Sequence, residues 1–158
     1  MTGQKYDLLS LWQKTNEKRK SMSDYVSKVH VINANDEQVF RKLSNFNSIQ
    51  NFASALPADA PVKDLKSDED WVSFKTTMIG EIVLRIVERE EFKTIKIESE
   101  KSPIPLTGWI QLVKMDDEHT KIRLTLRADI PFMLRTMIGS KIEEGIDKAA
   151  EALTKIPY

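Results

Sequence analysis

The sequence contains no cysteine in its 158 residues. This absence excludes a disulfide scaffold, a thiolate metal site, a thiol redox motif and a cysteine nucleophile. Glycine and proline are also scarce, with 5 and 6 residues, whereas 41% of the residues are hydrophobic. Such a composition is typical of a folded globular chain and not of a disordered one. The length suits a single domain with a substantial core.

Neither sign of charge is in excess, because 24 Lys and Arg residues balance 24 Asp and Glu residues. Nucleic-acid binding depends on surplus Lys and Arg, so we expect no nucleic-acid partner. No stretch approaches the roughly 20 apolar residues of a membrane span, and the N-terminus lacks the pattern of a signal peptide. We therefore expect a cytoplasmic protein without an integral membrane segment.

Residues 1–21 differ from the rest of the chain. Five basic and two acidic residues give them a net charge of +3, which leaves −3 on residues 22–158. An apolar cluster from Tyr6 to Trp12 precedes the basic stretch. This pattern fits a short amphipathic helix that touches a membrane surface or a partner, or else a flexible or non-native extension. We favour the extension, and we assign one domain to residues 22–158.

The first part of this domain predicts one strand and two short helices. β-branched residues favour a strand over residues 25–34. Asn35 is placed to cap the first helix, and Pro57 ends the second. The apolar residues of the two helices recur at short helical spacings: Val39, Phe40 and Leu43, then Phe46, Ile49, Phe52 and Leu56.

The remainder of the domain changes to a period of two residues before it ends in a helix. Six strands are predicted, over residues 62–66, 71–78, 81–90, 93–99, 106–115 and 119–129. Their apolar and polar faces are typical of an antiparallel sheet that is covered on one side, and the short links make neighbours hairpin partners. From Pro131 onward, apolar residues recur every three to four positions, which predicts a long helix.

This order of elements predicts an α+β fold, in which helices gather on one side of an antiparallel sheet. A sheet of about seven strands bends, so the C-terminal helix can lie in its concave face. Several stretches then resemble one family: Val31–Phe40, Leu43–Phe46, Gly80–Ile82 with Glu88–Glu90, and Ala149–Leu153. Together they resemble the helix-grip fold of the START-like superfamily, the polyketide cyclase and lipid-transfer group also called SRPBCC, over residues 24–156.

The resemblance implies a deep cavity between the sheet and the C-terminal helix, which the superfamily uses for lipids, sterols, polyketides, quinones or hormones. We therefore expect a non-enzymatic module that holds a hydrophobic or amphipathic small molecule of the lipid, polyketide or quinone kind. Two alternatives stay open. One is an enzyme of the cyclase or dehydratase type that uses the same cavity, and the other is a protein-binding module with a filled core.

Aromatic, methionine and aliphatic residues of the predicted elements are candidates for the cavity wall, and a few polar residues are candidates for orienting a ligand. The ligand-binding candidates are Phe46, Phe52, Phe74, Thr76, Leu84, Ile97, Trp109, Gln111, Leu124, Met133, Met137 and Ile138. The alternative is that they fill the core. The face of the Trp109 strand stays open: either Trp109 and Gln111 point inward, or Gly108 and Ile110 do.

Catalytic chemistry has only two weak candidates. His30 has the same strand parity as Ile32, so it could point into the cavity as a general base. Glu88 has the inward parity of its strand and could be a buried acid, although we favour a strand end that emerges into solvent. His119 lies in an acidic turn without the spacing of a metal site, so we expect no metal. Without a Gly-rich phosphate loop we expect no cofactor, and both a monomer and a dimer stay open.

Overall fold

The computed structural model of the chain describes residues 23–49, 62–77 and 80–158. Its described elements follow one another in this order: β1 (Ser23–Val26), β2 (His30–Ile32), α2 (Asp36–Leu43), the 3-10 helix η1 (Phe46–Ile49), β3 (Val62–Ser67), β4 (Trp71–Thr76), β5 (Gly80–Glu90), β6 (Thr94–Lys101), β7 (Leu106–Lys114), β8 (Thr120–Ala128) and α4 (Phe132–Leu153). The predicted extension over residues 1–21 and the Phe52–Leu56 part of the second predicted helix lie outside the described residues.

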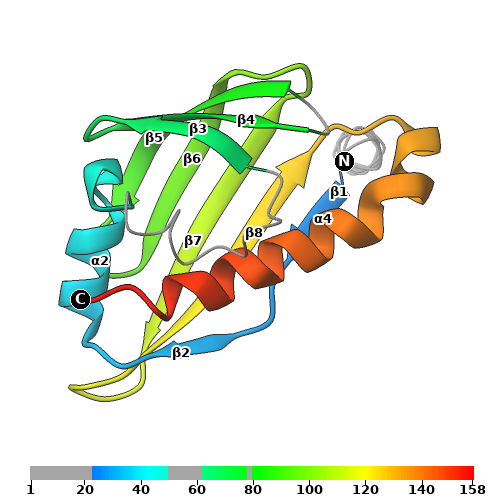
Figure 1. The fold of residues 1–158 in the computed structure, drawn as a ribbon. Coiled ribbons are helices and arrows are strands. Elements are labelled where there is room, and N and C mark those ends of the chain that lie inside the picture. The colour runs from blue at the N-terminus through cyan, green and yellow to red at the C-terminus, as the bar shows by residue number, and fades with distance from the viewer. Residues whose placement is uncertain (1–22, 50–61, 78–79) are drawn as a thin grey trace, which may run out of the picture.

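The eight strands form one antiparallel sheet in the order β1-β8-β7-β6-β5-β4-β3, with β2 also paired to β8. The sheet curves, and α4 runs across its concave side (Figure 1). All six strands predicted from the period of two are present as β3 to β8, and consecutive ones pair as hairpins. The α+β helix-grip architecture predicted from the sequence is therefore confirmed.

The strand predicted over residues 25–34 is instead two strands, which raises the number from seven to eight. Three residues separate Val26 from His30, whereas only two separate their partners Thr125 and Ile122 on β8. The extra residue interrupts the ladder at Ser27, whose hydroxyl oxygen accepts the Leu124 N–H at 2.9 Å. A side-chain oxygen thus takes the place of a backbone carbonyl as the hydrogen-bond acceptor. The alternation of apolar and polar residues does not predict this interruption of the strand.

Helix α2 begins where the sequence predicts it. The Asn35 side chain accepts the backbone N–H of Gln38 at 2.8 Å, and the Gln38 side chain accepts the Asn35 N–H at 3.3 Å. This reciprocal capping satisfies two N–H groups that the first helical turn leaves free. Its apolar residues Val39, Phe40 and Leu43 are all buried, so α2 closes one end of the concave face.

Helix α4 connects two separate apolar clusters. Its middle part, at Ile138, Ile142 and Ile146, packs with the cluster of Tyr25, Ala128 and Ile130, whereas its end at Leu153 belongs to a larger cluster that includes α2. These three isoleucines and Ala149 are only half-buried. No helix among the described residues is long and apolar enough to span a membrane.

Candidate functional site

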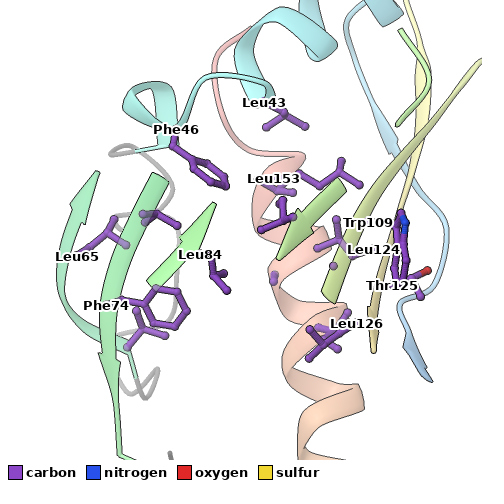
Figure 2. A pocket seen from close by; sticks show the side chains of 17 residues that line it. Leu43, Phe46, Leu65, Phe74, Leu84, Trp109, Leu124, Thr125, Leu126 and Leu153 are labelled. Atoms are coloured by element: carbon purple, nitrogen blue, oxygen red, sulfur yellow. The ribbon is translucent and has the colours of Figure 1, made fainter. Parts of the chain in front are cut away.

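A cavity of about 320 Å³ lies between the concave face of the sheet and α4. Residues of α2, η1, six strands and α4 surround it: Leu43, Phe46, Val62, Leu65, Val72, Phe74, Leu84, Ile97, Gly108, Trp109, Ile110, Leu124, Thr125, Leu126, Ile146, Ala149 and Leu153. Figure 2 shows Phe46, Phe74 and Leu84 directed toward the space that α4 bounds on its other side. The volume is within the range of small-molecule sites.

The strand register decides which face of β7 points into the cavity. Gly108 pairs with Ile97 and Leu126, and Ile110 pairs with Ile95 and Leu124. Directly opposed residues share a face of the sheet, so Gly108 and Ile110 point inward. The first of the two alternatives left by the sequence, with Trp109 and Gln111 inward, is therefore wrong.

Trp109 and Gln111 instead lie on the outer face of the sheet. The Trp109 ring contacts Arg127 and Lys96, whose cationic groups are 5.1 and 6.0 Å from its centroid. Figure 2 shows Trp109 and Thr125 on the far side of the strands, directed away from the cavity. These two residues therefore border the cavity through their backbones.

Apart from Trp109 and Gln111, the ligand-binding candidates lie at several different positions. Phe46, Phe74, Leu84, Ile97 and Leu124 line the cavity with their side chains. Thr76 lies at the end of β4, and Ile138 packs in the second apolar cluster beside Tyr25 and Ala128. Met133 and Met137, in contrast, are exposed on the outer side of α4, at 78% and 70%. Phe52 lies outside the described residues.

Most of the cavity wall was absent from the candidates named from the sequence. The missed side chains are Leu43, Val62, Leu65, Val72, Ile110, Leu126, Ile146, Ala149 and Leu153. The signal for the α4 members was present, because Ile146, Ala149 and Leu153 lie on the apolar stripe of that helix. Met133 and Met137 do not lie on this stripe. For α4, helical periodicity therefore predicts the cavity-lining residues better than residue type does.

Glu88 points away from the concave face. Ile86 pairs with Ile97 and Glu88 with Lys96, so Val87 is an additional residue in β5. Such a bulge reverses the alternation of side chains beyond it. The inward parity expected for Glu88 is therefore wrong, and its exposed side chain agrees with a strand end that emerges into solvent.

His30 has the predicted parity but does not reach the cavity. Its Nε2 lies 2.9 Å from Oδ1 of Asp147 on α4, and the Lys28 N–H donates to the same oxygen at 2.9 Å. The His30 hydrogen bond, followed by that of Lys28, lowers the pKa of Asp147 from its ordinary value. This contact ties α4 to the edge of the sheet, which is a structural role.

The acidic turn before β8 is closed by internal hydrogen bonds. His119 Nδ1 lies 2.8 and 3.0 Å from the two carboxylate oxygens of Asp116. The Glu118 N–H and then the His119 ring lower the pKa of Asp116. Within residues 23–49, 62–77 and 80–158, no group of three or more His, Cys, Asp or Glu residues could hold a metal ion.

No family model and no curated protein sequence matches the chain. Solved structures with the same fold do exist. Norcoclaurine synthase from Thalictrum flavum has a TM-score of 0.64 at 11% identity, with 87% of this chain and 88% of that chain covered. The Zhui aromatase/cyclase from Streptomyces sp. R1128 has a TM-score of 0.66 at 16% identity, with 85% and 92% covered. A START superfamily protein from Mycobacterium smegmatis has a TM-score of 0.59 at 12% identity, with 85% and 97% covered.

Proposed function

We propose that this chain, which has the START-like (SRPBCC) helix-grip fold, is a binding protein for a hydrophobic or amphipathic small molecule. The observation that carries the proposal is the 320 Å³ cavity, whose inward-pointing described side chains are all apolar. Burial of apolar surface stabilises a complex by about 25 cal/mol per Å², so an apolar cavity alone supports useful affinity.

The size and lining of the cavity also support binding. Small-molecule sites have volumes of about 300 to 1,000 Å³ and are lined mainly by apolar side chains. The cavity, at about 320 Å³ and with apolar inward-pointing side chains among the described residues, has both properties.

The two alternative functions are less well supported. A cyclase or dehydratase needs an acid or a base beside its substrate, and neither His30 nor Glu88 lies in the wall of the cavity. The cavity also argues against a protein-binding module with a filled core. Two of the solved structures with this fold are enzymes by their names, but identities of 11% and 16% extend only to the fold.

Native mass spectrometry of the protein purified from cells tests the proposal. We expect an additional mass that denaturation releases, and liquid chromatography of the extract should identify it as a hydrophobic molecule. Ala149→Phe fills the cavity from α4 and should abolish this mass, whereas Met137→Phe, on the exposed side of the same helix, should retain it. Protein that is always free of ligand, and that takes up no added hydrophobic molecule, would contradict the proposal.

A further inference from the structure

The part of the cavity wall that the structure describes offers a ligand no charged partner. Among the described residues that surround it, none is ionisable, and only Trp109 and Thr125 have polar side-chain atoms. The Thr125 hydroxyl donates to Gln111 Oε1 at 3.2 Å on the outer face, and the Trp109 ring lies against Arg127 there. Neither side chain therefore presents a hydrogen-bonding group to the interior.

The backbone of the sheet does not supply a partner either. Gly108, in the cavity wall, is paired on both sides, with Ile97 of β6 and Leu126 of β8. N–H and C=O groups engaged in such ladders are not free to bind a ligand. An ionised group buried here would stay unpaired, which is strongly unfavourable.

Among the described residues that surround the cavity, Gly108 is the one position without a side chain. Its neighbours on the same face, Ile97 and Leu126, are both large, and a side chain added at position 108 would project between them into the cavity. A Cβ at this position would lie 3.8 Å from the Thr125 carbonyl oxygen and 3.9 Å from the Ile97 Cβ. Both are ordinary van der Waals distances, so packing of the protein alone does not demand glycine here.

We propose that the cavity is specific for neutral, predominantly hydrocarbon molecules and that Gly108 determines the size of ligand it accepts. This inference rests on the proposed binding function and deepens it. A ligand with an ionised head is accepted only if the head remains outside the described wall.

Two dyes test the charge requirement, since N-phenyl-1-naphthylamine and 1-anilinonaphthalene-8-sulfonate share one ring system and differ by a sulfonate. Fluorescence titration should show saturable binding of the neutral dye and at least about 100-fold weaker binding of the anion at the same site. The site is identified by competition between the dyes and by sensitivity to Gly108→Val. Equal affinities at this site would overturn the neutral specificity while leaving the binding function intact.

Gly108→Val tests the role of the glycine, because the added branched side chain suits a strand and projects into the cavity. We expect a loss of about tenfold or more in affinity for the neutral dye, and a smaller loss for Gly108→Ala. Gly145→Ala is the matched control, since a Cβ there meets no atom within 4 Å, and it should bind as the wild type does. Thermal unfolding of each variant shows that it is folded.

Three results separate the two levels of the proposal. Folded Gly108→Val protein with wild-type affinity would overturn the role of Gly108. Selective loss of affinity in Gly108→Ala and Gly108→Val, with Gly145→Ala unchanged, would support it even if the valine variant were less stable. Wild-type protein that binds neither dye and carries no copurified ligand would overturn the proposed function itself.

Discussion

At the scale of single residues, the hydrogen bonds to Asp147 connect the wall of the cavity to the edge of the sheet. The His30 ring and the Lys28 N–H both donate to the Asp147 carboxylate. Asp147 directly follows Ile146, a residue of the cavity wall. Charge-assisted hydrogen bonds of this kind are stronger than neutral ones. We infer that they fix the position of α4 relative to β2.

Replacing Asp147 by alanine should therefore destabilise the protein, by about 1 kcal/mol for a partly exposed group. The pKa of Asp147 is lowered in the folded state, so its contribution is present above the unfolded pKa of about 3.9 and is lost as the pH falls through the lower folded value. Urea unfolding between pH 3 and pH 7 measures this. Glu143→Ala, on the exposed side of α4, is the control. The assignment would be contradicted if the difference in free energy of unfolding between the wild type and Asp147→Ala grew toward low pH.

Met133 and Met137 provide a second test at this scale. Their residue type predicted a place in the cavity, but both side chains are exposed in the structure. The double variant Met133→Ser and Met137→Ser should change the free energy of unfolding by no more than about 0.5 kcal/mol, as is usual for surface positions. Affinity for the neutral dye should stay at the wild-type value. A tenfold loss of affinity would place these side chains in the site after all.

At the scale of elements, the junction between β1 and β2 depends on one serine. Ser27 is buried, and its hydroxyl oxygen accepts the Leu124 N–H at the bulge. Ser27→Ala leaves that N–H without its partner and should cost about 1 to 3 kcal/mol. Denaturant unfolding measures the loss, with the exposed Ser140→Ala on α4 as the control. Equal stability of the two variants would mean that the Ser27 hydroxyl does not support the junction.

The strands could be predicted from the sequence, whereas the face that each strand directs into the cavity could be predicted only in part. Alternation predicts β3 to β8 because one face is buried and the other is solvated. It fails at β7, where Trp109 and Ile110 are both large and apolar, and at Val87, where one extra residue reverses the face of Glu88. Both failures concern the register between neighbouring strands, which the sequence pattern of one strand does not contain. Since these faces define the cavity, its position was predictable and most of its wall was not.

At the scale of the whole molecule, the described residues form two apolar clusters, and members of both line the cavity. A ligand that binds only the folded state stabilises it by about 2.7 kcal/mol at 100 times its Kd. For a chain of this length, Tm should then rise by roughly 5 to 10 °C. Differential scanning fluorimetry with increasing N-phenyl-1-naphthylamine should show this rise in the wild type and not in Ala149→Phe. An equal rise in both proteins would place the dye outside the cavity.

A crystal structure of the protein purified from cells without lipid removal tests the account most directly. The account predicts continuous electron density between Gly108 of β7 and Ala149 of α4 that no protein atom explains. It also predicts that this density belongs to an uncharged, largely hydrocarbon molecule. Side chains of the protein that fill the same space would contradict the account, because no cavity would then remain for a ligand.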